Sequence, residues 1–270
     1  MNNFLYSQLI QPNLDNKETF LLLDDGKSFS YEEIISIASK ISHKLIKFGL
    51  KVGDHILVKA PKCKETIALY LSSIMTGAVY IPLNSNYTPI ETNYFVKDSK
   101  PAFLICEESE IQKLKPICDE IGCKILSMNV NGEGEITDGL KNFDSYFKPA
   151  FRKDDDLAAL LYTSGTTGKP KGAMLTQLNL VSNANQLVNL WNINRDDTLI
   201  HSLPIYHTHG LFVAMNTTMM AGATVRLLKN FNLDYVFEAF DKSTLMMGVP
   251  TYYTRSVSYT HLRAHETTCD

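Results

Sequence analysis

Short apolar segments alternate with amphipathic segments along the first half of the chain. The apolar runs lie at residues 55–60, 78–83, 103–106 and 124–127. Helix-like patterns fill the gaps, at residues 64–75, 89–97 and 108–120. Strands that are apolar throughout are buried on both faces, as happens where helices cover both faces of a parallel sheet. The alternation therefore predicts an α/β fold of layered, largely parallel sheets flanked by helices.

Local signals place further elements on either side of this region. Ser30 and Glu33 have the spacing of a capping box, apolar residues at helical spacing follow them, and Gly49 is a natural helix stop. Residues 129–156 are rich in Gly, Asn and Asp and predict a surface connection. Residues 179–191 predict a helix, and residues 199–203 and 224–228 predict extended segments.

A Gly- and Thr-rich segment directly follows a buried strand predicted at residues 157–161. Residues 162–172 read YTSGTTGKPKG. Glycines let the backbone approach an anion closely, hydroxyl and N–H groups can hold phosphate oxygens, and lysines neutralise their charge. The pattern predicts a loop for the β- and γ-phosphates of a nucleotide, with these expected contacts: Thr163, Ser164, Gly165, Thr166, Thr167, Gly168, Lys169 and Lys171.

This loop does not have the spacing of a Walker A loop. That pattern needs four residues between its glycines and a Ser or Thr after its Lys. Here two residues separate Gly165 from Gly168, and Pro170 follows Lys169. The spacing excludes a P-loop kinase or GTPase, and the remaining alternative for the segment is a polar surface turn.

Composition limits the classes of binding partner and the cellular compartment that we expect for this protein. The formal net charge is -3 and the isoelectric point is near 6.2, so nothing indicates a nucleic-acid partner. The five cysteines lack a CxxC pair with nearby histidines, so we expect free thiols in a reducing cytosol rather than a zinc site. The N-terminus lacks the features of a signal peptide, and the long apolar stretches are broken by Pro, Gly and polar residues. We expect a cytoplasmic protein with no membrane span.

The phosphate loop and three other segments resemble the acyl-adenylate-forming superfamily, which includes acyl-CoA synthetases, peptide-synthetase adenylation domains and luciferases. Residues 162–172 resemble its signature. Three further segments are similar to family motifs in the same order: residues 29–34 (FSYEEI), 76–84 (TGAVYIPLN) and 203–211 (LPIYHTHGL). The resemblance covers roughly residues 5–255 and implies the N-terminal portion of an acyl-adenylate-forming enzyme.

Residues 206–213 (YHTHGLFV) and 247–255 (MGVPTYYTR) are similar to segments of malonyl-CoA synthetases in particular. By this resemblance, Arg255 lies in the acyl pocket and holds the second carboxylate of malonate, in keeping with the bidentate pairing of guanidinium and carboxylate groups. His207 would be a catalytic and substrate-binding residue beside the phosphate and CoA path, and His209 a substrate-binding residue. The alternatives are a surface role for Arg255 and structural roles for the two histidines.

The resemblance also implies the chemistry and the cosubstrates. The carboxylate attacks the α-phosphorus of Mg-ATP, giving acyl-AMP and pyrophosphate, and the thiol of coenzyme A then displaces AMP to form a thioester. The loop residues would hold the leaving pyrophosphate, and Thr167 would contact Mg²⁺. The expected partners are a small carboxylate, ATP and CoA, with malonate as the expected acid.

Several parts of the family pattern have no counterpart in this chain. Full members are about twice as long, and the Tyr-Gly-x-Thr-Glu segment, the ribose motif, the hinge and the C-terminal catalytic Lys are absent. We expect residues 1–255 to form a partial N-terminal domain without the C-terminal cap domain: a first subdomain at about 1–175 and the start of a second at about 176–255. Residues 256–270 resemble translated sequencing adapter and are expected to be a non-native tail.

Three functional hypotheses follow. The main one is an acid–thiol ligase for malonate, of which this fragment alone is inactive. The second is an adenylating enzyme for another carboxylic acid, such as a short fatty acid or an amino acid. The third is a non-catalytic module that binds ATP without turnover. The sequence does not indicate an oligomeric state.

Overall fold

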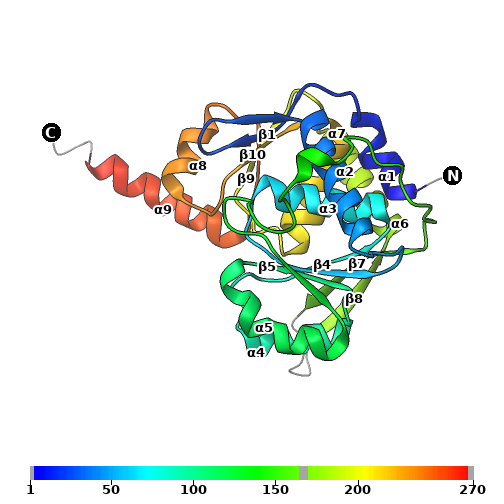
Figure 1. Cartoon of the computed structure of the whole chain (residues 1–270). Helices are drawn as coiled ribbons and strands as arrows, with labels where there is room; N and C mark the ends of the chain where they lie inside the picture. Colours follow the sequence, from blue (N-terminus) through cyan, green and yellow to red (C-terminus); the bar gives the residue numbers. More distant parts are fainter. Residues whose placement is uncertain (1–2, 164–169, 267–270) are drawn as a thin grey trace.

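Two β-sheets, with helices between and outside them, make up the body of the chain (Figure 1). The computed structural model describes residues 3–163 and 170–266, with side chains as far as residue 258. Within this part of the chain, one sheet has six strands in the order β6-β5-β3-β4-β7-β8, and the other has five in the order β11-β9-β10-β1-β2. The expected α/β class with layered, largely parallel sheets is confirmed.

The six-stranded sheet is formed by the region in which apolar and amphipathic segments alternate. Its strands are β3 (His55–Lys59), β4 (Val79–Pro82), β5 (Phe103–Cys106), β6 (Lys124–Ser127), β7 (Leu157–Thr163) and β8 (Lys171–Thr176). The connecting helices are α3 (Lys64–Thr76), α4 (Pro89–Ser99) and α5 (Glu108–Ile121). Neighbouring strands are parallel except for β8, which runs antiparallel to β7. The parallel strands therefore end at one edge of the sheet.

The five-stranded sheet combines segments from distant parts of the sequence. Its strands are β1 (Thr19–Leu23), β2 (Ser28–Ser30), β9 (Thr198–His201), β10 (Thr224–Leu227) and β11 (Leu245–Met247). The hairpin β1-β2 joins it through parallel pairing of β1 with β10. Strands from both sides of residue 175 thus share one sheet, and the division of the chain near that residue stays a prediction.

Helices α2 (Tyr31–Lys47) and α3 lie between the two sheets (Figure 1). The helix α2 begins at the expected capping box, where the Glu33 N–H donates to Ser30 Oγ at 3.1 Å and the Ser30 N–H donates to the Glu33 carboxylate at 2.7 Å. Ile56 and Val58 of β3 are buried in the cluster around these helices, whereas Leu57 is buried in the cluster with α4 and α5. Each such burial contributes roughly 1.5–3 kcal/mol.

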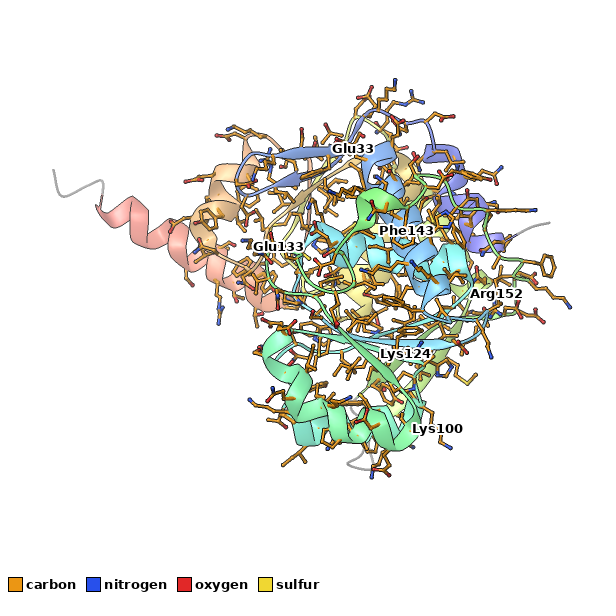
Figure 2. All side chains as sticks on the ribbon, viewed as in Figure 1. Glu33, Lys100, Lys124, Glu133, Phe143 and Arg152 are labelled. Carbon is orange, nitrogen blue, oxygen red and sulfur yellow. The ribbon has the colours of Figure 1, made fainter. Side chains whose placement is uncertain are left out.

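The connection between β6 and β7 is tied to the helical layer. Figure 2 labels Glu133, Phe143 and Arg152 along it. The Lys44 ammonium on α2 donates to the backbone carbonyl of Asp138 at 2.6 Å and also bonds that of Glu135. Ile136 is fully buried, although most residues of the connection keep some exposure. This expected surface connection is therefore anchored in the core at Ile136.

Further helical segments lie along the rest of the described chain. They are α1 (Phe4–Leu9), η1 (Gln11–Asn13), η2 (Leu140–Asn142), α6 (Gln177–Trp191), the π-helix η3 (His209–Met215), α7 (Asn216–Ala221), α8 (Leu233–Phe240) and α9 (Pro250–Glu266). None of the helices in the described residues is long and apolar enough to cross a membrane.

The helix α9 continues past residue 255, where the expected non-native tail begins. A helical backbone does not test the origin of residues 256–270, which stays a prediction.

A buried ion pair links the first sheet to α5 and gives a testable prediction. The Lys59 ammonium at the end of β3 is 0 % exposed, and it pairs with the Glu110 carboxylate in the first turn of α5. We expect Glu110→Leu to lower the free energy of unfolding by about 3 kcal/mol, because it leaves a buried charge without its partner. The double variant Lys59→Met/Glu110→Leu should recover most of this loss. Urea denaturation measures both, and a double variant as unstable as the single one would contradict the explanation.

Candidate active site

A cavity of about 310 Å³ opens where the carboxyl ends of strands from both sheets meet. Its lining includes one residue after each of five strands: Lys62 after β3, Asn86 after β4, Glu107 after β5, Tyr206 after β9 and Lys229 after β10. In parallel α/β sheets, ligands bind outside the carboxyl ends of the strands. The position of this cavity therefore makes it the leading candidate for a ligand site.

The loop that follows β9 and includes the start of η3, residues 202–210, carries the two histidines that were predicted from the sequence; His209 is the first residue of η3. His201 precedes this loop and is fully buried. Burial lowers the pKa of His201 to about 3, so its ring is neutral and donates from Nε2 to the Gly210 carbonyl at 2.7 Å. A Cβ atom at Gly210 would stand 2.1 Å from the Pro204 carbonyl oxygen. The loop can close in this way only because residue 210 has no side chain.

His207 and His209 face different surroundings. His207 is exposed and its ring contacts the Tyr206 ring, with 4.5 Å between the centroids. His209 is partly buried and lines a separate cavity of about 270 Å³ that also includes Trp191 and Tyr253. Desolvation lowers the pKa of both imidazoles, which favours their neutral forms near neutral pH. The described side chains include no group of three that could hold a metal ion, so a metal role for the pair gains no support.

Arg255 lies on α9, three residues after Tyr252. Tyr252, one turn before it, stacks on Phe231 with 3.8 Å between the ring centroids. Burial raises the pKa of Tyr252, Tyr206 raises it further, and the charge of Arg255 lowers it. Tyr252 thus lies within electrostatic range of both Tyr206 and Arg255. The guanidinium group is exposed and forms no ion pair with the side chains that the structure describes, so it has an unpaired positive charge to offer.

The described ends of the phosphate loop lie on two paired strands. Thr163 ends β7 and Lys171 begins β8, and the two residues face each other in the antiparallel ladder. Both are exposed. The other expected contacts lie outside the described residues: Ser164, Gly165, Thr166, Thr167, Gly168 and Lys169. The structure thus anchors the predicted loop on a rigid strand pair at the edge of the sheet.

Helix α4 holds both ends of this loop through residues that the sequence analysis did not select. The Tyr162 hydroxyl donates to the Asp98 carboxylate at 2.6 Å, and the Tyr94 hydroxyl donates to the Pro170 carbonyl at 2.8 Å. The Phe95 ring packs against Tyr162, with 4.7 Å between centroids. Tyr94 and Asp98 are four residues apart and so share one face of the helix. That spacing was visible in the sequence, but nothing local indicated what the face contacts.

Comparison with known proteins agrees with the geometry. The family model described as AMP-binding enzyme matches residues 11–268, so the chain belongs to the AMP-binding enzyme family. It is 30% identical to malonate–CoA ligase of Arabidopsis thaliana, over 86% of this chain and 43% of that protein. It is 32% identical to a mitochondrial malonate–CoA ligase of Xenopus laevis, over 90% of this chain and 43% of that protein.

Solved structures give the same picture. Apo MatB from Rhodopseudomonas palustris superposes with a TM-score of 0.92 at 38% identity, over 96% of this chain and 51% of that one. ATP-bound MatB from the same organism gives a TM-score of 0.92 at 39% identity, over 95% of this chain and 51% of that one. The resemblance drawn from the motifs is confirmed. The chain spans about half the length of these relatives.

The close approach at Gly210 predicts a local stability effect. We expect Gly210→Ala to lower the free energy of unfolding by about 1–3 kcal/mol, because the new methyl group must displace the backbone at Pro204. Thr208→Ala, at an exposed position in the same loop, is the control and should change little. Urea denaturation measures both. Equal stabilities of the two variants would mean that the loop relaxes without cost.

Proposed function

We propose that this chain is part of an ATP-dependent acid–thiol ligase whose acid is malonate. The observation that carries the proposal is 39% identity to ATP-bound MatB over 95% of this chain, with a TM-score of 0.92. Two curated relatives at 30% and 32% identity are malonate–CoA ligases. Because the chain spans about half of each relative, complete turnover is proposed for the whole enzyme, and the chain alone is proposed to be inactive.

The proposed reaction has two steps. A malonate carboxylate oxygen forms a bond to the α-phosphorus of ATP while the bond to pyrophosphate breaks, giving malonyl-AMP. The sulfur of CoA then attacks the acyl carbon, AMP leaves with the bonding electron pair, and the thiol proton passes to solvent or to a base. Positioning and neutralisation of charge at phosphorus are the main protein contributions to such a transfer.

Residues of this chain would supply part of that positioning. Lys171 and Thr163 stand at the two ends of the phosphate loop, where an ammonium and a hydroxyl can contact pyrophosphate oxygens. His207 is exposed beside Tyr206, a residue that lines the 310 Å³ cavity. A neutral imidazole there can accept or donate a proton near the reacting groups. Arg255, which forms no ion pair with the described side chains, would bind the second carboxylate of malonate, and His209 would contribute to the acyl side.

Mg²⁺ enters the proposal as an ion carried by ATP. The side chains that the structure describes contain no cluster of acidic, histidine or cysteine residues that could hold a metal by themselves. Mg²⁺ commonly binds through substrate phosphates with few protein ligands. The Thr167 hydroxyl, outside the described residues, is its proposed protein contact. A cytoplasmic location is proposed on the basis of the free cysteines.

The two hydrogen bonds that Tyr94 and Asp98 of α4 form with the ends of the phosphate loop provide a test of ATP binding by this chain. Asp98→Asn and Tyr94→Phe each weaken one of the two bonds that hold the loop ends, so each should raise the Kd for ATP about fivefold, as the loss of one modest hydrogen bond implies. Lys97→Gln is the control on the same helix, since its contact with Glu120 is a solvent-exposed ion pair. Isothermal titration calorimetry measures Kd. A wild-type chain that binds no ATP would contradict ATP binding by this part of the enzyme.

Arg255 tests the choice of acid. We suggest a chimera that joins residues 1–255 of this chain to the remaining part of R. palustris MatB, assayed for malonate-dependent pyrophosphate release. Arg255→Met should lower kcat/KM for malonate about tenfold to hundredfold, because a charge-assisted contact to a carboxylate is lost. Arg195→Met, at another exposed arginine, should have no effect.

The outcomes of this assay separate the rival functions. Unchanged malonate use by the Arg255→Met chimera would sink the role of Arg255, and activity with a different acid would favour an adenylating enzyme of other specificity. A non-catalytic module that binds ATP without turnover is the second candidate. Two results together would support that module. The 270-residue chain would bind ATP without catalysing pyrophosphate exchange, and the chimera would be folded but inactive.

A further inference from the structure

Lys62 connects the two sheets at the edge of the 310 Å³ cavity. It follows β3 of the six-stranded sheet, and its Nζ donates to the backbone carbonyls of His201 at 2.9 Å and Leu203 at 2.8 Å. His201 ends β9 of the five-stranded sheet, and its carbonyl also accepts from the N–H of Leu228 at 3.1 Å. The ammonium therefore bonds the first residues of the loop that carries His207.

The surroundings of this ammonium are unusual for a lysine near a cavity. Burial lowers the pKa of Lys62 well below its ordinary range, and the carboxylate of Asp24 opposes this effect. Among the side chains that the structure describes, none forms an ion pair with Lys62. A desolvated ammonium is costly unless hydrogen bonds compensate it. Here two backbone carbonyls accept hydrogen bonds from Lys62 and provide that compensation. Loss of these hydrogen bonds is therefore unfavourable for Lys62 as well as for the loop.

The loop is held at both of its ends. At its start, Lys62 bonds the carbonyls on either side of Ser202. At its end, the buried ring of His201 bonds the carbonyl of Gly210 at 2.7 Å. Between these two attachments lies the exposed imidazole of His207. Lys62 and Tyr206 also line the same cavity, so the tether stands beside the space that the loop borders.

We propose that Lys62 is a positioning residue: it tethers the two sheets and fixes the backbone of residues 201–203, and through it the place of His207. The tether itself follows from the contacts of Lys62, whereas its importance for turnover rests on the proposed function. Lys62 acts through the main chain of the loop and needs no contact with the reacting atoms.

Hydrogen exchange in the 270-residue chain tests the tether directly. In Lys62→Met, which keeps most of the apolar stem and removes the donor, amide exchange in peptides covering residues 202–211 should speed up about tenfold. Peptides covering β3 to β6 should change less than about twofold. Lys62→Arg keeps a charged donor and should restore most of the protection. Lys64→Met is the matched control, because the Lys64 ammonium pairs with neighbouring Glu65 rather than with the loop.

Two results would overturn the tether. The first is unchanged exchange at residues 202–211 in Lys62→Met. The second is an equal increase over the whole chain, which would indicate general loss of stability rather than release of one loop. If Lys62→Met does not fold, Lys62→Gln takes its place, because it retains a neutral amide donor. We expect faster amide exchange at residues 202–211 in this variant too, by a smaller factor. Unchanged exchange there would also overturn the proposal.

Kinetics of the MatB chimera test the consequence for the reaction. Lys62→Met should lower kcat with malonate about tenfold while the KM for ATP stays within about twofold, because the phosphate loop joins β7 and β8, which β4 separates from β3. Faster exchange at residues 202–211 with unchanged kcat would refute positioning of a catalytic group. An inactive wild-type chimera would count against the proposed function, while the exchange result would still decide on the tether.

Discussion

Both sheets bury apolar side chains against the same helical layer, and this shared burial fixes how the sheets face each other. Phe20 of β1 and Ile56 of β3 belong to one apolar cluster with α2 and α3. A directional contact adds to it, since the Tyr31 hydroxyl on α2 donates to the Ala223 carbonyl before β10 at 2.6 Å. Apolar burial is strong but has no direction, so hydrogen bonds of this kind select one relative placement. The cavity between strand ends exists because of that placement.

The sequence predicted the first sheet well because its signal is local. Each of its parallel strands is an apolar run, and the connecting helices have boundary signals of their own, such as the capping box of Thr88 and Glu91 at the start of α4 or Gly77 after α3. The second sheet was harder to predict. The strand β1 pairs with β10, whose partner residues are about 200 positions away, and no periodic pattern encodes such a pairing. In the first sheet, the strand β8 was not predicted, because its residues are exposed and it overlaps the end of the Gly-rich segment.

Motifs predicted residues for the candidate site but not the contacts that support them. Motifs selected His207, Arg255 and the phosphate loop, because residue types at fixed spacing can be read directly. The supports are contacts between residues far apart in the sequence. Lys62 reaches a carbonyl 139 positions away, and Tyr94 one 76 positions away. Side chains of this kind look like ordinary surface residues until the fold is known. The π-helix at His209–Met215 was equally invisible, since such a helix has no sequence pattern of its own.

Three of the supports share one chemical feature: they bond main-chain carbonyls. Lys62 holds the carbonyls of His201 and Leu203, the His201 ring holds that of Gly210, and Tyr94 holds that of Pro170. A loop fixed through its backbone keeps its own side chains available, so His207 can stay exposed while its Cα position is constrained. His201 is the last residue of a strand, Tyr94 lies on a helix, and Lys62 lies in the short connection between β3 and α3. These contacts fix the positions of the loops, and the loop side chains that take no part in them are free to contact a ligand.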